Sequence, residues 1–455
     1  MSENHHLLRL QQLLSRRPAK ASHILSELGI SQPTFSRLWK TVEGGVALGA
    51  TRTRQYALRR QVAGVDIPIP IFRISEQGQT ELLGELEPLQ GGFYALTRIH
   101  EGTKGTDYKL LEGMPYFLRD LRPQGFLGRM EPGKYPELDL PADILRWTDE
   151  QVLKYISRRS ENAAGDLILG NESYARYLAS LSAATEPLRA SERGERYPRM
   201  AEHAMQGEAP GSSVGGEQPK FTAVIDRVAA QETIEHVMVK FSPPVDTGSG
   251  RRWGDLLVCE HLALEVLIQN GIAAVRTSIL EAGGRVFLEV VRFDREGATG
   301  RRPMATFAAL DGDLGMMDQN WTAVARELGR LGQLSQRDIE TVEILDLYGA
   351  LIGNTDKHHR NITVAWTLEQ QYRLQAAYDM LPMLYRPNTH GEIIDRVWTP
   401  HLGGQLALRH LPRCHGMARH FWQDVLDDGR ISSEFKEYVA QPHLNALRNL
   451  LPDAG

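Results

Sequence analysis

Cysteine is scarce in this chain of 455 residues, which contains only Cys259 and Cys414. Two cysteines exclude a framework of several disulfides and a zinc site built from cysteine ligands. Long apolar runs are also missing, because stretches such as residues 67–72 fall far below the roughly 20 residues needed to cross a bilayer. The first residues lack the apolar core of a secretion signal. These absences predict a reduced, cytoplasmic protein with no membrane partner.

Charge of one sign does not dominate the whole chain, but it is unevenly distributed. The chain has 52 Lys and Arg against 57 Asp and Glu, a formal charge of −5. Residues 1–60 carry ten basic and three acidic side chains, a charge of +7, so residues 61–455 must carry −12. A basic segment ahead of an acidic body predicts an anionic partner for that segment alone. A solvated charged surface is the alternative, and charge by itself does not separate the two.

Residues 1–62 have the pattern of a winged helix-turn-helix domain that binds DNA. Leucines recur at helical spacing over residues 7–14, and residues 19–28 form a second amphipathic segment. Ser31 is expected to cap a third helix, whose outward polar side chains would meet base edges and phosphates. Two short strands around a basic turn follow at 44–60, as in a wing. A helical docking domain that never touches nucleic acid is the alternative. The predicted DNA contacts are Ser31, Gln32, Thr34, Ser36, Arg37, Lys40, Arg52 and Arg54.

Residues 63–200 are less informative. Short apolar runs at 67–74 and 93–99 predict strands, and residues 142–159 predict a helix. The polar stretch 182–213 has Pro and Gly scattered through it and is interpreted as a loop or exposed connector. Taken alone, this part of the chain predicts only a mixed α and β structure.

A glycine-rich motif, GSSVGGEQPKF at 211–221, precedes an apolar strand at 236–241 that carries Lys240. Small residues let backbone N–H groups approach phosphates closely, and a lysine within an apolar strand needs a partner for its charge. A glycine-rich loop followed by a strand lysine is the arrangement of a protein kinase. In a Walker A motif the lysine belongs to the loop itself. The loop alone is a weak signal, because many such loops are only turns.

The predicted partner of Lys240 is Glu260, which lies on a helix expected over residues 255–270. Glu265 is the rival carboxylate on the same helix. At about 4 Å and an effective dielectric constant near 20, such an ion pair gains about 4 kcal/mol before desolvation is counted. An amphipathic helix with exposed acids is the alternative.

The strongest signal lies at residues 348–380, where an apolar helix leads into a polar loop and two strand-like runs. In an antiparallel hairpin whose paired positions sum to about 740, Asn361 would lie opposite Asp379 and beside the loop that contains Asp356. An Asp, an Asn five residues later and an Asp at the far end of a hairpin match a protein kinase. There, the first Asp accepts the proton of the substrate hydroxyl, and the other two side chains hold Mg²⁺.

His358 and His359 lie in the same loop. Adjacent histidines point in different directions, and no cysteine or third histidine is placed to complete a zinc site. Roles in shaping the loop or facing phosphate are therefore favoured for them.

Taken together, NTDKHHRN, AAYDM, SVGGEQPKF and VVRFDR resemble the HipA family of bacterial serine/threonine toxin kinases over most of residues 65–440. The resemblance implies an α+β fold, with a two-lobed, protein-kinase-like body behind the small winged helix-turn-helix domain. Val291 departs from the family, whose hinge has Glu at this position. The expected segments are 1–62 (DNA-binding), 63–200 (β-rich), 201–295 (kinase N-lobe with glycine-rich loop and ATP lysine) and 296–455 (helical C-lobe).

The resemblance also implies roles for individual residues, with ATP and Mg²⁺ as cofactors. Ser213 falls where the family autophosphorylates, and Ser212 is a second acceptor. Asp356 falls on the catalytic base, Asn361 and Asp379 on the metal ligands, and Glu260 on the partner of the ATP lysine. The implied ATP-binding residues are Ser213, Val214, Gly215, Gly216, Lys240, Arg292, Phe293 and Asp294.

We therefore predict an ATP- and Mg²⁺-dependent protein serine/threonine kinase of toxin type that binds DNA through its own N-terminal domain and autophosphorylates in its glycine-rich loop. A transcription regulator whose kinase-like body senses nucleotide is one alternative. A toxin that acts on DNA directly is another, since acidic residues with Mg²⁺ also serve nucleases. A HipB-like antitoxin and a second copy of the chain are candidate protein partners, and the nucleoid is a candidate location within the cytoplasm.

Overall fold

The computed structural model divides the chain into two compact units. The first comprises Met1–Arg122 with Tyr135–Ala184, and the second comprises Pro123–Lys134 with Thr185–Gly455. Within the described residues, no helix combines the length and the apolar character needed to span a bilayer. The four predicted segments of the chain stay a prediction. The structure describes residues 3–50, 54–100, 103–183, 186–206, 218–226, 234–367, 369–400 and 406–451.

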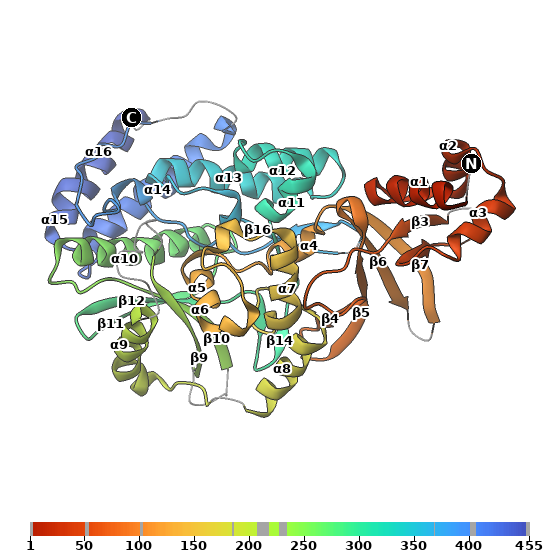
Figure 1. Cartoon of the computed structure of the whole chain (residues 1–455). Coiled ribbons are helices and arrows are strands. Elements are labelled where there is room, and N and C mark those ends of the chain that lie inside the picture. The colour runs from red at the N-terminus through yellow and green to blue at the C-terminus, as the bar shows by residue number, and fades with distance from the viewer. Residues whose placement is uncertain are drawn as a thin grey trace. The chain divides into compact units, whose positions relative to one another are not determined.

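The first unit begins with three helices and a small antiparallel sheet, in the order that the sequence predicts (Figure 1). Its elements are α1 (Glu3–Arg16), β1 (Ala19–Lys20), α2 (Ala21–Leu28), α3 (Gln32–Trp39), β2 (Gly45–Leu48) and β3 (Gln55–Leu58). The Ser31 Oγ caps α3 by accepting the backbone N–H of Thr34 at 3.4 Å. Phe35 and Leu38 are buried where α3 packs against α1 and α2. β2 and β3 pair as the predicted wing strands.

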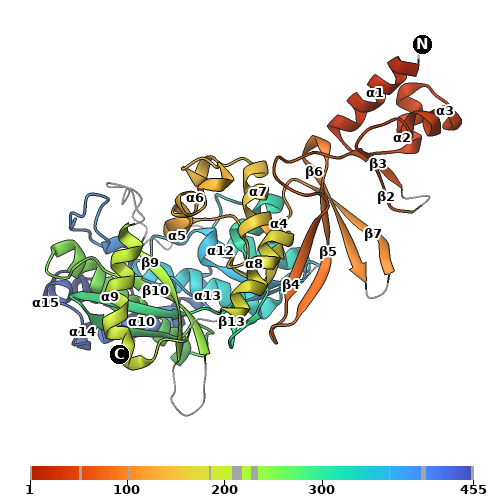
Figure 2. The same cartoon turned by 60° about the horizontal axis from the view of Figure 1, so that its bottom comes forward.

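The rest of the first unit is a five-stranded antiparallel sheet with helices (Figure 2). The strand order is β7-β6-β5-β4-β8. β4 and β6 confirm the strands predicted at 67–74 and 93–99. The helix predicted from residue 142 begins only at Asp149, because Thr148 and Gln151 form a capping box that fixes its start. The elements are β4 (Ile69–Ile74), β5 (Thr80–Pro88), β6 (Phe93–His100), β7 (Thr103–Glu112), β8 (Leu167–Leu169), α4 (Tyr116–Arg119), α7 (Asp149–Arg159) and α8 (Asn171–Ser182).

The second unit begins with a four-stranded antiparallel sheet in the order β11-β12-β10-β9. Lys240 on β10 lies opposite Leu288 on β12 and opposite Lys220 on β9. Side chains alternate between the faces of a strand, so Lys240 points away from the face that carries Val239 and Phe241. The elements of this part are α5 (Gly125–Arg129), α6 (Glu131–Lys134), α9 (Ala190–Gln206), β9 (Lys220–Asp226), β10 (Ile234–Phe241), α10 (Gly248–Gln269), β11 (Thr277–Ala282), β12 (Arg285–Val291), β13 (Arg295–Glu296) and β14 (Gly300–Arg301).

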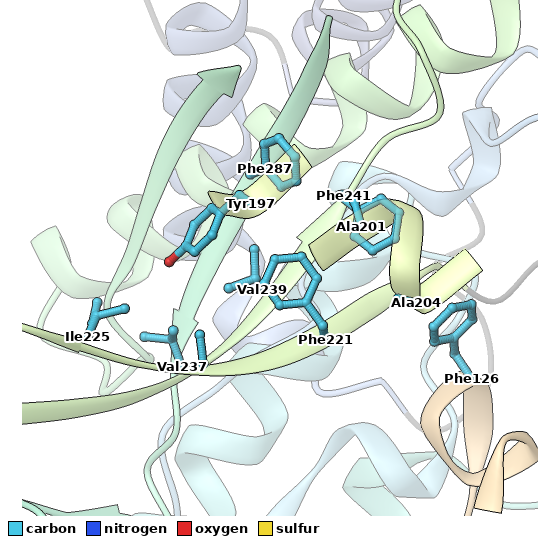
Figure 3. Packing of buried hydrophobic residues seen from close by; sticks show 11 residues of the cluster. Phe126, Tyr197, Ala201, Ala204, Phe221, Ile225, Val237, Val239, Phe241 and Phe287 are labelled. Carbon is cyan, nitrogen blue, oxygen red and sulfur yellow. The ribbon is translucent and has the colours of Figure 1, made fainter. Parts of the chain in front are cut away.

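Helix α9 corrects the prediction that residues 182–213 are a loop or exposed connector. Tyr197 and Ala201 on this helix are buried in one cluster with Val239 and Phe241 of the sheet (Figure 3). Pro198 lies inside the helix, where proline is ordinarily unfavourable. Burial of the apolar face against the sheet offsets that cost, and the charged residues between the apolar positions obscured the helical pattern.

The remainder of the second unit is mostly helical. The predicted helix that leads into the polar loop is α13, and the predicted hairpin is formed by β16 and β17, with β15 beside β16. The elements are β15 (Ala305–Thr306), α11 (Phe307–Leu314), α12 (Trp321–Arg330), α13 (Gln336–Ile352), β16 (Thr363–Trp366), β17 (Tyr372–Leu374), α14 (Leu411–Asp427), α15 (Ser433–Phe435) and α16 (Gln441–Leu450). Short 3₁₀ turns include His359–Asn361 and Met383–Tyr385.

Candidate active site

Lys240 lies at the centre of a buried ionic cluster. Its Nζ donates to Oε1 and Oε2 of Glu260 at 2.6 and 2.7 Å and also to Oδ1 of Asp379. Lys240 is 4% exposed and Glu260 is fully buried, whereas the Asp379 side chain is 28% exposed. Glu260, and not Glu265, is therefore the helix carboxylate that pairs with Lys240.

The charges of this cluster act against the effect of burial. Burial alone would lower the pKa of Lys240, but Asp379 and Glu260 raise it above its usual value, so the ammonium stays charged. Burial raises the pKa of Glu260 against the pull of Lys240. Burial would also raise the pKa of Asp379, but Lys240 and Lys220 together lower it. Asp379 is therefore the firmly ionised carboxylate on the more exposed side of the cluster.

Asn354 joins the loop of Asp356 to the segment of Asp379. Gly353 ends α13 in the left-handed conformation, with φ of 84°. The Asn354 side chain, in a residue that is 3% exposed, accepts the backbone N–H of Asp356 at 2.9 Å and donates to the carbonyl of Asp379 at 3.3 Å. Sequence reasoning missed this residue. Its only signal was a small polar residue directly after the glycine that ends a helix.

Asn361 completes this arrangement from the other end of the loop. Its Nδ2 donates to the carbonyl oxygen of Asp356 at 2.9 Å, which leaves its Oδ1 facing elsewhere. Within the described ranges, neither this Oδ1 nor the Asp356 carboxylate accepts a hydrogen bond. No group of three or more His, Cys, Asp or Glu among the described residues could hold a metal alone. Asn361 and Asp379 offer two hard oxygen ligands, a set that fits Mg²⁺ completed by water and phosphate oxygens.

The hairpin register differs from the predicted one by two positions. Val364 pairs with Leu374, so paired positions sum to 738, and Asn361 does not lie opposite Asp379. β17 ends at Leu374, and Asp379 lies farther along the chain with a φ of 52°. The side chain of Asp379 therefore reaches Lys240 from an irregular segment rather than from a strand. The tight turn that sets the register cannot be read from the alternation of apolar residues.

Residues 292–294 lie beside the segment of Asp379. Arg292 donates to both carboxylate oxygens of Asp294 at 3.0 and 2.7 Å. The ring of Phe293 stacks on that of Tyr378, with centroids 5.6 Å apart. Because Tyr378 directly precedes Asp379, the structure brings the predicted adenine-side segment next to the predicted metal-side segment.

The two histidines of the loop have different environments. His359 is buried, and its Nε2 lies 2.8 Å from the carbonyl oxygen of Gln319. His358 is exposed, and its backbone carbonyl accepts the indole N–H of Trp321 at 3.1 Å. His359 thus shapes the loop, and the side chain of His358 is left on the surface of the site.

His443 fixes the C-terminal end of α13. Its Nε2 lies 2.9 Å from the carbonyl oxygen of Leu351, and its Nδ1 lies 2.7 Å from the hydroxyl of Tyr385. The imidazole is stacked between Trp398 and Trp422. Burial lowers the pKa of His443 to about 3. A neutral imidazole therefore anchors the turn from which the loop of Asp356 begins.

Several predicted residues lie outside the described residues, so their placement is not part of the site. They are Arg52 of the wing and, in the glycine-rich loop, Ser212, Ser213, Val214, Gly215 and Gly216.

Two family descriptions match separate parts of the chain. Residues 212–431 match the HipA-like C-terminal domain, and residues 65–178 match the middle domain of a YjjJ-like toxin. Together with the fold, these matches define a HipA-like toxin with a kinase-like body. The chain is also 32% identical over 443 residues to Toxin YjjJ of Escherichia coli K12, covering 97% of each chain. It belongs to this family of YjjJ-like, HipA-related toxins, as the sequence predicted, and the predicted fold class is confirmed.

Two solved structures were also found to be similar. HipA of Shewanella oneidensis MR-1, solved with HipB and its operator DNA, is 14% identical with a TM-score of 0.48, covering 83% of this chain and 97% of that chain. The proinflammatory kinase CtkA of Helicobacter pylori is 14% identical with a TM-score of 0.35, covering 51% of this chain and 88% of that chain. Both TM-scores are below 0.5, so neither structure supports a conclusion about this protein.

Proposed function

We propose that this toxin is an ATP- and Mg²⁺-dependent protein serine/threonine kinase. The observation that carries the proposal is the buried cluster of Lys240, Glu260 and Asp379, which Asn354 ties to the loop of Asp356. A charged lysine that is fixed by two carboxylates suits a site for the phosphates of ATP. Nuclease chemistry offers no evident use for such a lysine.

The remaining residues take the roles that phosphoryl transfer requires. The carboxylate of Asp356 would accept the proton of a Ser or Thr hydroxyl on the protein substrate. Asn361 and Asp379 would hold Mg²⁺, which when bound neutralises the charge of the phosphates. Lys240 would contact the same phosphates from the sheet.

Nucleotide binding and self-modification follow from the same proposal. Residues 213–216 and the segment Arg292, Phe293 and Asp294 would surround ATP. Autophosphorylation would occur at Ser213, with Ser212 as the neighbouring acceptor. A phosphate there adds about −1.5 to −2 charges beside those of ATP, so it would expel the loop and switch the enzyme off.

Purified full-length chain incubated with Mg²⁺ and ATP labelled at the γ-phosphate should label itself. Asp379→Ala should abolish the labelling, because it removes a metal ligand and one carboxylate partner of Lys240. Asp427→Ala, an exposed aspartate of α14, is the matched control and should label like the wild type. Equal labelling of all three proteins would rule out the proposed kinase site. No labelling of the wild type, together with DNA cleavage or nucleotide-sensitive DNA binding, would favour the alternatives.

The N-terminal helices and wing are proposed to bind DNA. Gln32, Ser36, Arg37 and Lys40 are exposed along one side of α3, which suits contact with base edges and phosphates. The hydroxyls of Ser31 and Thr34 lie 3.0 Å apart at the start of the helix, so both are engaged in its cap. Arg54 is exposed on the wing, and Arg52 is proposed to act with it.

Two of the basic residues in this segment are already used within the first unit. Arg59 forms an ion pair with Glu87. Arg60 donates to the hydroxyl of Tyr94 at 2.8 Å and lies over its ring. The cations left for DNA are therefore concentrated on α3 and the wing. A HipB-like antitoxin and a homodimer stay candidate partners under this proposal.

If about six phosphates are contacted, affinity for duplex DNA should fall about a thousandfold between 50 and 200 mM salt. Replacing both Arg37 and Lys40 by Ala should weaken binding and reduce the salt dependence by about two phosphate contacts. Arg146→Ala, an exposed residue of the same unit, is the control. Fluorescence anisotropy with labelled duplexes measures all three proteins. Salt-independent binding, or equal binding by the double variant, would contradict the proposed surface.

A further inference from the structure

We propose that Asp255 and Ser432 form a clamp that positions Glu260, and through it Lys240, for contact with the phosphates of ATP. The inference rests on the proposed function and adds to it a device outside the site. Asp255 is one turn before Glu260 on α10, and Ser432 comes 177 residues later in the chain.

The clamp is a pair of short, buried hydrogen bonds. The Asp255 Oδ1 accepts the backbone N–H of Ser432 at 2.7 Å, and its Oδ2 accepts the Ser432 hydroxyl at 2.7 Å. Asp255 is 4% exposed. Both oxygens of a buried carboxylate are thus satisfied by one residue, which also caps the short helix α15 by accepting the backbone N–H of Phe435.

A second contact fixes the same end of α10. Arg252 is buried, donates to the carbonyl oxygen of Tyr385 at 3.1 Å and lies over the ring of Phe435, 5.3 Å from its centroid. Tyr385 is six residues after Asp379, and its hydroxyl meets His443. The first turns of α10 are therefore bound both to the C-terminal helices and to the segment that follows Asp379.

Further contacts hold the rest of α10. The Tyr348 hydroxyl of α13 donates to the carbonyl oxygen of Ala263 at 3.3 Å. Arg413 of α14 donates to the carbonyl oxygen of Asn270 at 2.8 Å, at the C-terminal end of α10. The helix is thus held at its beginning, middle and end by elements that also carry the loop of Asp356.

This arrangement has a consequence for Glu260. In protein kinases, the ion pair between the strand lysine and the helix glutamate forms only when that helix is in place. A helix bound along its length keeps the pair of Lys240 and Glu260 assembled without modification of another segment. The clamp would therefore set the position of the ammonium group, and loosening it would weaken the contact with phosphates rather than with adenine.

The test compares Asp255→Ala and Ser432→Ala with the conservative variants Asp255→Asn and Ser432→Thr. Calorimetry gives the affinities for ATP and for adenosine, and labelling with ATP gives kcat and KM. Each Ala variant should lower kcat by about tenfold to a hundredfold, the cost expected of a small misplacement, and should weaken ATP binding. Adenosine affinity should stay unchanged, and the conservative variants should recover most of the activity. Ser433→Ala, exposed beside the clamp, is the control.

Wild-type kcat and ATP affinity in both Ala variants would overturn the clamp while leaving the proposed function intact. A parallel loss of adenosine affinity and of thermal stability would also overturn it, because the two residues would then only maintain the fold. Failure of the wild-type chain itself to bind ATP would overturn the proposed function, and is a different result from either of these.

Discussion

Replacing Asp356 by Asn should lower kcat for phosphoryl transfer by about 10²- to 10⁴-fold, the range for removal of a general base. The backbone N–H of Asp356 is held by Asn354, and its carbonyl by Asn361. The side chain itself takes no part in these bonds, so an amide of the same shape should leave the loop in place. The substitution removes only the group that accepts the hydroxyl proton. The affinity for ATP should therefore change little.

Single-turnover autophosphorylation measures the rate, and calorimetry with ATP measures the affinity. Asp427→Asn provides the control for loss of a surface carboxylate. A variant that retains the wild-type rate would exclude Asp356 as the base. A loss of ATP affinity as large as the loss of rate would assign Asp356 to nucleotide binding instead. Wild-type protein that binds ATP and DNA but transfers no phosphate would identify a nucleotide-sensing regulator.

Replacing Lys240 by Met should destabilise the second unit by about 3–5 kcal/mol, because it leaves a buried charge without its partner. The two carboxylates of Glu260 and Asp379 would then lie close together with no cation between them. The double variant Lys240→Met with Glu260→Gln should recover most of this stability, since the fully buried negative charge is gone. Phosphoryl transfer should stay lost in both variants, because neither has the lysine.

The destabilisation by Lys240→Met should also depend on pH. Burial already raises the pKa of Glu260 in the wild type, and without Lys240 this pKa should rise further. A carboxyl whose pKa is higher in the folded than in the unfolded state binds protons more tightly when folded, so stability falls as pH rises through that interval. The difference from wild type should therefore be smaller at pH 5 than at pH 8.

Urea unfolding at the two pH values measures this difference. Lys134→Met, a half-exposed lysine of α6, is the control and should unfold like the wild type. If Lys240→Met were as stable as wild type at pH 8, the buried cluster would have no energetic role. If the double variant regained activity, the lysine would have no role in phosphoryl transfer.

Much of the site was predicted from local sequence alone. Lys240 was identified because a lysine among apolar strand residues requires a partner, and Glu260 because it lies on the following helix. Asp356, Asn361 and Asp379 were identified by residue type and spacing. The cap by Ser31 and the stop of α13 at Gly353 follow from short-range backbone preferences, which depend on only a few neighbouring residues.

Other features depended on contacts between distant parts of the chain. The helix α9 was missed because its stability comes from packing Tyr197 and Ala201 against the sheet, while Pro198 and the charges around it favour a loop. The hairpin register was wrong by two positions because the geometry of the turn sets it.

The sequence by itself determined which elements form and which side chains carry chemistry, because residue type and periodicity are local properties. The tertiary structure alone decided that Lys240 lies between Glu260 and Asp379, that Asn354 joins two loops, and that Asp255 meets a serine 177 residues away. Such contacts are set by how packed elements exclude water and satisfy their buried polar groups, and spacing along the chain does not encode these distances.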